Sequence, residues 1–281
     1  MELLQPATWD EALAAKAAHP EALPLTGGTD VMVELNFGRT RPEAILDLTR
    51  IAELRDHGPE DGLLRVGAGV TYSRAIAELA GVLPGLALAS RTVGSPQIRN
   101  RGTIGGNLGS SSPAGDALPP LYASGATVEL ASTRGTRTIP IDEFITGPKR
   151  NVLEPDELIA AFRVAPARGG QEFSKIGTRN AMVIAVCSFA LALDDDRRQV
   201  GTCIGSAAPT PRRAHEAETF AAAELDWDAR APIPDATLTR FGELVANAAS
   251  PIDDQRGSAA YRRHALAVMA RRTLKWAWAC A

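Results

Sequence analysis

The 281-residue sequence predicts an α+β fold. Strand and helix patterns mix without the strict alternation of a doubly wound sheet, and three helical patterns follow one another in the last third of the chain. Hydrophobic residues make up 45% of the chain, enough for a substantial buried core, and no sequence repeat recurs at a fixed period.

Charge and special residues exclude several classes of protein. Thirty basic and 33 acidic side chains give a net charge of −3, without the basic surplus of nucleic-acid binders. No apolar run is long enough to span a membrane and no leader pattern opens the chain, so we expect a cytoplasmic protein without a transmembrane segment. Three isolated cysteines and four unpaired histidines indicate neither disulfides nor a metal site nor an iron–sulfur cluster on this chain.

The opening residues predict a small β-α-β subdomain over about residues 1–55. Thr8 and Glu11 form a capping box that starts a helix, and Pro20 ends it because a residue before proline disfavours helix. Strands are expected at 3–4, 23–25 and 44–48, with a short helix at 31–36.

A second subdomain is expected over residues 56–168, and a separate domain over 169–281. The linker is 166–170, a proline- and glycine-rich stretch. The expected elements of the second subdomain are strands at 63–68, 126–132, 136–141 and 157–164, a helix that Thr71 caps, a further element at 83–91 and a long loop at 92–116. For the last domain they are strands at 182–193 and 199–206 and helices at 213–223, 235–248 and 258–278.

Two glycine-rich segments are the main candidates for chemistry. Gly27–Gly28 lies between a strand and a helix start, and Gly105–Gly106 opens the richer loop. Adjacent glycines let main-chain amides point into one concavity without interference from a Cβ atom, which suits a phosphate. A diphosphate carries two anionic groups, so two converging loops predict a dinucleotide site, whereas either loop alone is more simply a tight turn.

The familiar nucleotide and hydrolase motifs are absent. Residues 67–72 begin like a GxGxxG fingerprint but lack the third glycine, and a turn capped by Thr71 explains them better. Neither GxxxxGK[ST] nor GxSxG occurs, which disfavours P-loop enzymes and α/β-hydrolases. No convincing acid–base pair is present, so we predict no catalytic residue on this chain.

Four segments together resemble one family in the right order. The stretch TVGSPQIRNRGTIGGNLGSSSPAGD (92–116) is similar to the flavin loop of the molybdenum hydroxylases, in particular of their separate FAD subunits, as in carbon monoxide dehydrogenase (medium subunit) and bacterial xanthine dehydrogenases. Residues 25–38, 173–181 and 251–264 match three further family segments. The resemblance implies a two-subdomain FAD-binding domain of the vanillyl-alcohol-oxidase type, followed by a domain with an antiparallel sheet and helices.

The resemblance also implies which residues hold FAD. Asp116 would bind ribityl or ribose hydroxyls, Ile159 would lie near the flavin, and Lys175 would favour a reduced, anionic ring. Neither glycine loop contains the histidine that tethers FAD in some related flavoenzymes, so noncovalent binding is expected. The implied cofactor-binding set is Leu25, Thr26, Gly27, Gly28, Thr29, Asp30, Thr103, Ile104, Gly105, Gly106, Asn107, Ser110, Asp116, Ile159 and Lys175.

The function that the resemblance implies is electron transfer. FAD would accept electrons from 2Fe-2S clusters on a small partner subunit and pass them to an external acceptor, while a large partner carries the molybdenum cofactor. A dimer of heterotrimers is the implied assembly, and the substrate and terminal acceptor stay open. The alternatives are a self-sufficient flavin reductase of the same superfamily and a flavin-free scaffold subunit.

Overall fold

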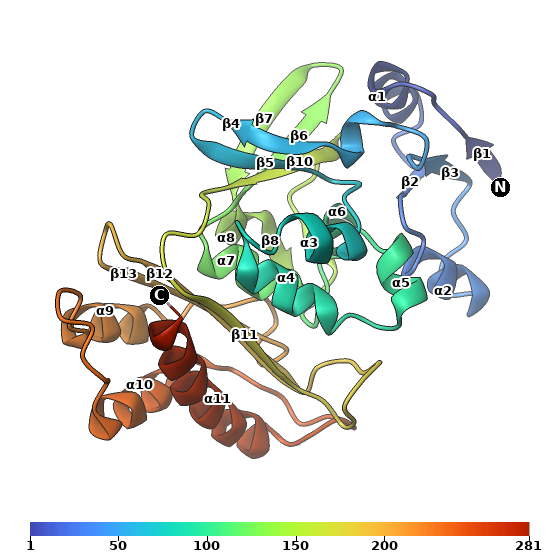
Figure 1. Ribbon diagram of the computed structural model, residues 1–281. Coiled ribbons are helices and arrows are strands. Elements are labelled where there is room, and N and C mark those ends of the chain that lie inside the picture. Colours follow the sequence, from blue (N-terminus) through green and yellow to red (C-terminus); the bar gives the residue numbers. More distant parts are fainter. Residues whose placement is uncertain (281) are drawn as a thin grey trace.

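Four sheets, of three, five, three and two strands, organise residues 1–280, the part of the chain that the computed structural model describes (Figure 1). The three-stranded sheet near the N-terminus is parallel, in the order β1-β3-β2. The five-stranded sheet is antiparallel, in the order β4-β5-β10-β6-β7. The third sheet, β11-β12-β13, is also antiparallel and belongs to the last third of the chain, so the α+β prediction is confirmed.

The first subdomain forms as its capping pattern predicts. The Thr8 hydroxyl accepts a hydrogen bond from the Glu11 amide, the Glu11 carboxylate accepts one from the Ala7 amide, and the helix ends at His19. The elements are β1 (Glu2–Leu4), α1 (Trp9–Ala18), β2 (Leu23–Leu25), α2 (Val31–Asn36), β3 (Ala44–Asp47) and the 3₁₀ turn η1 (Glu53–Arg55).

The five-stranded sheet is built around β10, whose residues are nearly all buried. The expected strands of this region are confirmed, but the edge strand β4 was missed because its sequence, HGPE, contains glycine and proline and has no alternating apolar pattern. The strands are β4 (His57–Glu60), β5 (Leu63–Gly67), β6 (Thr127–Ser132), β7 (Gly135–Pro140) and β10 (Leu158–Val164), with the short pair β8 (Ile145–Gly147) and β9 (Arg150–Asn151) nearby.

The stretch 92–116 is not the long loop that its composition predicts. It contains two short helices, which Ser95 and Thr103 cap by accepting hydrogen bonds from the amides of Ile98 and Gly106. The many glycines and serines concealed these caps, because the same residues are typical of loops. The helices of this region are α3 (Tyr72–Glu78), α4 (Pro84–Arg91), α5 (Pro96–Arg101), α6 (Ile104–Ser110), α7 (Leu118–Ala123) and α8 (Ile141–Phe144).

The last third of the chain packs helices on its sheet. The strand expected from residue 182 begins only at Cys187, and Met182 adopts a positive φ of 50°, outside the range of a regular strand. Strand β11 was not predicted. The three expected helices are present. The elements are β11 (Gln171–Ile176), β12 (Cys187–Asp194), β13 (Gln199–Gly205), α9 (His215–Glu224), α10 (Asp235–Ala248) and α11 (Ala259–Ala279).

The sheet β11–β13 is shared between two hydrophobic cores. On β12, Phe189 and Leu191 belong to the core beneath α10 and α11, whereas the alternate residue Ala190 belongs to the core of the first 165 or so residues. On β13, Gly201 leaves no space for a side chain, because a Cβ there would lie 3.0 Å from the carbonyl carbon of Ala123 in α7 and nearer still to its oxygen. Helices α4 and α7 therefore pack against the same sheet as α11, and the two parts of the chain are joined through a buried interface.

Candidate functional site

A cleft of about 1480 Å³ runs between the first glycine loop, the helices α5 and α6, and the loops that flank β12 and β13. All of the candidate cofactor residues line it except Leu25, Ile104 and Lys175. The Ile104 side chain is instead fully buried in the core, and Leu25 belongs to strand β2. The candidates that line the cleft are Thr26, Gly27, Gly28, Thr29, Asp30, Thr103, Gly105, Gly106, Asn107, Ser110, Asp116 and Ile159.

The first loop presents free main-chain donors to the cleft. Gly28 adopts a left-handed φ of 74°, which turns the chain from β2 into α2. Within the described residues, the amides of Gly27, Gly28 and Thr29 donate no hydrogen bond. Asp30, at the start of α2, makes no side-chain cap, so these amides are available to an anionic group.

The second loop differs from the expected amide concavity. The amides of Ile104 and Gly105 donate to the carbonyls of Val70 and Ala68, and the Gly106 amide donates to the Thr103 hydroxyl at 2.9 Å. Its main-chain donors are thus already paired. Here the role of Gly105 is to let α6 lie close to Ala68, the residue that follows β5. A Cβ on Gly105 would lie 2.6 Å from the Ala68 Cα, so only glycine fits at this position.

The two loops meet at their threonines. The hydroxyls of Thr26 and Thr103 are 2.9 Å apart, and a Cβ on Gly106 would lie 3.3 Å from the Thr26 oxygen. The other contact is at Gly27, where a Cβ would lie 2.7 Å from the carbonyl carbon of Arg101. The pair of hydroxyls and the free amides of the first loop therefore face the same space.

Asp116 forms a buried ion pair with Lys175. The Lys175 ammonium donates to Asp116 Oδ2 at 2.6 Å and to the Thr92 carbonyl at 3.3 Å, and both charged side chains are nine-tenths buried. Burial raises the pKa of Asp116 to about 6 despite the opposing charge of Lys175. Lys175 thus reaches the cleft only through Asp116, whose second oxygen, Oδ1, has no partner in the described chain.

Asn107 and Ile159 form part of the cleft lining. The Asn107 side-chain carbonyl accepts from the Ala117 amide at 3.2 Å, and its amide group fills the space where Gly115 has no Cβ. Ile159 is 9% exposed, at a bulge in β10, and its side chain would lie 3.5 Å from a Cβ on Gly109. Asn107 therefore fixes the turn that carries Asp116, and Ile159 gives the cleft an apolar floor.

Sequence reasoning missed the wall contributed by the last third of the chain. Ser206, Asp254, Arg256 and Arg262 line the cleft, and Arg262 is only 4% exposed. In the sequence, the segment 251–264 resembles the family but gives no indication of the roles of its residues. Tyr72 was also missed: it lines the cleft, and burial followed by the charges of Asp116 and Asp30 raises its pKa well above the ordinary value.

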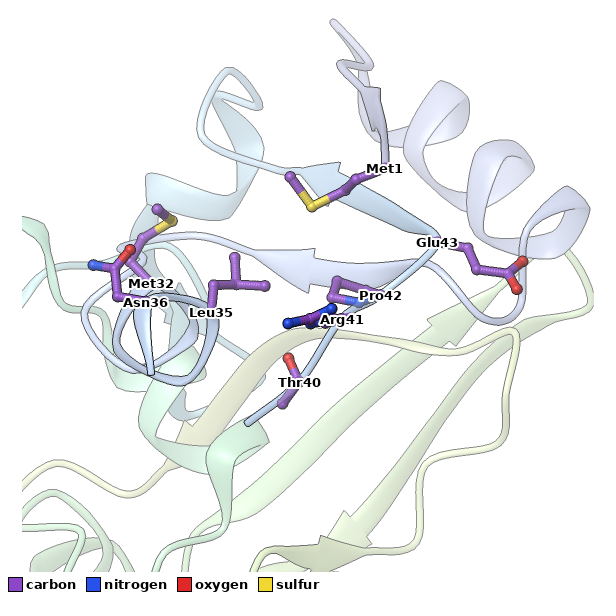
Figure 2. Close-up of a pocket in the computed structure, with 8 residues that line it drawn as sticks. All are labelled: Met1, Met32, Leu35, Asn36, Thr40, Arg41, Pro42 and Glu43. Carbon is purple, nitrogen blue, oxygen red and sulfur yellow. The ribbon is translucent and has the colours of Figure 1, made fainter. Parts of the chain in front are cut away.

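A second hollow, of about 640 Å³, lies on the other side of α2 (Figure 2). Its lining is formed by the chain start, α2 and the approach to β3, and it contains none of the candidate residues. Of these two hollows, only the larger cleft is lined by candidate residues.

Residues 1–280 lack two further features, a metal-binding cluster and a membrane-spanning helix. No three side chains of histidine, cysteine, aspartate or glutamate are placed to hold a metal ion. None of the helices combines the length and apolar character needed to cross a lipid bilayer.

Comparison with known proteins explains this arrangement. Residues 1–166 match the family of the FAD binding domain in molybdopterin dehydrogenase, and residues 172–277 match the CO dehydrogenase flavoprotein C-terminal domain. The xanthine dehydrogenase FAD-binding subunit of Escherichia coli O157:H7 is 34% identical over 284 residues, covering 98% of this chain and 95% of that protein. The nicotinate dehydrogenase FAD-subunit of Eubacterium barkeri is 33% identical over 220 residues, covering 73% of this chain and 74% of that one.

A solved structure agrees with both family matches. A chain of carbon monoxide dehydrogenase from Hydrogenophaga pseudoflava superposes with a TM-score of 0.90 at 28% identity, covering 100% of this chain and 98% of that chain. The resemblance found in the sequence is confirmed, and the expected two-part fold with it. The chain belongs to the FAD-binding subunits of the molybdopterin dehydrogenases, and is an oxidoreductase subunit of the molybdenum hydroxylase family.

Proposed function

We propose that this chain holds FAD noncovalently in the large cleft, with the diphosphate between the two glycine loops. The observation that carries this proposal is the meeting of Thr26 and Thr103, 2.9 Å apart, beside the unpaired amides of Gly27 and Gly28. Hydroxyl and amide donors that converge on one space suit phosphate oxygens. Among the described residues that line the cleft there is no histidine or cysteine, which supports a noncovalent site.

The donor set fits the rest of the cofactor as well. Asp116 Oδ1 is a buried acceptor without a partner, and a ribityl or ribose hydroxyl would satisfy it. The apolar side chain of Ile159 and the buried ring of Tyr72 suit an aromatic ring system. Lys175 holds the Asp116 carboxylate in place and would supply positive charge on this side of the bound cofactor. The full set proposed to bind FAD is the fifteen residues expected from the sequence, with Leu25, Ile104 and Lys175 supporting the lining residues rather than forming the cleft surface themselves.

The role of the chain is to bind and orient this cofactor for electron transfer. When bound, FAD supplies a redox centre that exchanges electrons singly or in pairs. The protein residues provide orientation, exclude water and set the local charge. No side-chain acid–base pair is required for that role, and we assign none.

We further propose that the chain works within a larger complex. A small subunit with 2Fe-2S clusters would deliver electrons and a large subunit with the molybdenum cofactor would oxidise the substrate, in a dimer of heterotrimers in the cytoplasm. The family names of the relatives support this, and the three cysteines, all without disulfide partners, suit a reducing compartment. We divide the chain into domains at residues 1–168 and 169–281, with subdomains of about 1–55 and 56–168.

The match of residues 172–277 favours a complex subunit over a self-sufficient reductase or a flavin-free scaffold. Affinity purification of the native chain tests this. We expect a yellow complex with flavin absorption, containing one partner with iron and labile sulfide and another with molybdenum. A chain that purifies alone and reduces a small substrate with NADPH would contradict the proposal, as would a complex without flavin.

A further inference from the structure

We propose that Arg262 is a positioning residue of the FAD site, which acts on the flavin domain through the main chain of Ser206. The inference rests on the proposed function, because it concerns how the last domain fixes one wall of the cofactor cleft. It assigns a role to the segment 251–264 beyond a family match.

Two successive hydrogen bonds connect Arg262 to the second glycine loop through Ser206, and a third binds Arg262 to Asp254. One guanidinium nitrogen of Arg262 donates to Asp254 Oδ1 at 2.6 Å, and the other donates to the Ser206 carbonyl, also at 2.6 Å. The Ser206 amide in turn donates to the Pro113 carbonyl at 2.9 Å. Pro113 is three residues before Asp116, so helix α11 is linked to the turn that carries the buried carboxylate.

Ser206 has a backbone conformation that needs such support. Its φ is +58°, a left-handed conformation that residues other than glycine adopt at a cost. The strain persists because both main-chain polar groups are held, the carbonyl by Arg262 and the amide by Pro113. The Ser206 hydroxyl has no partner within residues 1–280, so the residue makes its protein contacts through its backbone.

An arginine is suited to this place and a lysine is not. Arg262 is 4% exposed, and its planar guanidinium bridges a carboxylate and a carbonyl at the same time. Asp254 is held in turn by the Arg256 amide at 2.7 Å and by the Arg256 side chain at 3.2 Å. A lysine ammonium at the end of a flexible chain could satisfy one acceptor well but would not fix the angle between the two.

Within residues 1–280, this link is one of two hydrogen-bonded connections between the last domain and the turn 113–116. The other is Lys175, which binds Asp116 directly. The two attachments hold the segment 113–116 at both ends against the sheet β11–β13. If only Lys175 remained, Asp116 would keep its counter-ion, but Pro113 would lose its fixed distance from the sheet.

The test uses full-length Arg262→Met and Arg262→Lys, with Arg213→Met as the matched control. Arg213 lies in the same domain and is bound to Glu218 by two hydrogen bonds, at 3.0 and 2.9 Å, but it does not line the cleft. Two quantities are measured: the FAD dissociation constant by calorimetric titration, and the hydrogen exchange of the Ser206 amide in the FAD-free chain.

We expect Arg262→Met to weaken FAD binding about tenfold, the effect of losing one charge-assisted hydrogen bond that orders the site. The Ser206 amide should lose protection, and Arg262→Lys should show both effects to a smaller degree. Arg213→Met should show neither effect, even if it lowers the melting temperature by as much as Arg262→Met does. If Arg262→Met does not fold, the lysine variant decides the matter by the same two measurements.

Unchanged FAD affinity in a folded Arg262 variant would overturn the inference. So would weakened binding with a fully protected Ser206 amide, because Arg262 would then contact FAD directly instead of acting through the main chain. Failure of the wild-type chain to bind FAD would be a different result: it would refute the proposed function.

Discussion

Replacing Gly27 with alanine tests the contact between the two glycine loops. The new Cβ atom would lie 2.7 Å from the carbonyl carbon of Arg101, 2.8 Å from the Gly102 Cα, and nearer still to the Arg101 oxygen. All three atoms belong to the main chain, so no side-chain rotation can relieve the overlap. Ordinary contact begins at 3.4 Å, so the loops must separate by about 1 Å.

Separation of the loops should lower both the folding stability and the affinity for FAD. Overpacking of a tightly fitted site costs about 1–3 kcal/mol of folding stability. Loss of one hydrogen bond to a charged group costs about 1.5–3 kcal/mol of binding energy, which corresponds to a dissociation constant for FAD that is about 10 to 150 times higher.

Calorimetric titration of the FAD-free chain with FAD measures the effect, and thermal unfolding measures the stability. Gly58→Ala is the matched control, because Gly58 lies in strand β4 with no atom within 4 Å of a built Cβ. We expect the control to bind FAD as the wild type does. If Gly27→Ala binds FAD as tightly as Gly58→Ala, the loops do not jointly form the diphosphate site and the reasoning is wrong.

Further predictions concern the buried pair and the second core. Because burial raises the pKa of Asp116 from 3.8 to about 6, ionisation of Asp116 destabilises the fold; the unfolding free energy of the wild type, minus that of Asp116→Asn, should fall by roughly 2 kcal/mol as the pH rises from 4 to 7. A free-energy difference that does not change with pH would contradict this prediction. Lys175→Met should cost about 3–5 kcal/mol in denaturant unfolding, and the double variant Asp116→Asn/Lys175→Met much less; a double-variant loss equal to the sum of the two single-variant losses would show that the two charges do not interact. Phe241→Ala should lower the unfolding free energy by about 3–5 kcal/mol, because the ring is fully buried and packs edge-on against Phe189 at 6.3 Å; a loss under about 1 kcal/mol would indicate a site that repacks.

Local patterns predicted most of the elements because their signals are contained in a few neighbouring residues. Thr8 and Glu11 mark the start of α1 within four residues, and they behave in the structure as the capping box requires. The strand β12 was extended too far, because residues 182–186 are apolar and a positive φ at Met182 leaves no trace in hydrophobicity. The short helices in 92–116 were hidden by glycines that also suit loops.

The site could be predicted only in part, because its contacts join distant positions. The pattern of adjacent glycines located both loops, but it could not show that the amides of Ile104 and Gly105 are taken by Val70 and Ala68. Lys175 and Asp116 are separated by 59 residues in the sequence, and nothing local marks them as a pair. The same holds for Arg262, whose partners are brought to it by the packing of α11 on the sheet β11–β13.

The central claim is that one FAD lies in the large cleft with its diphosphate between the two loops. A crystal structure of the full chain grown with FAD tests it most directly. We predict density for the diphosphate within hydrogen-bond distance of the amides of Gly27 and Gly28 and of the hydroxyls of Thr26 and Thr103. Flavin density elsewhere on the chain, with those groups facing only solvent, would contradict the account.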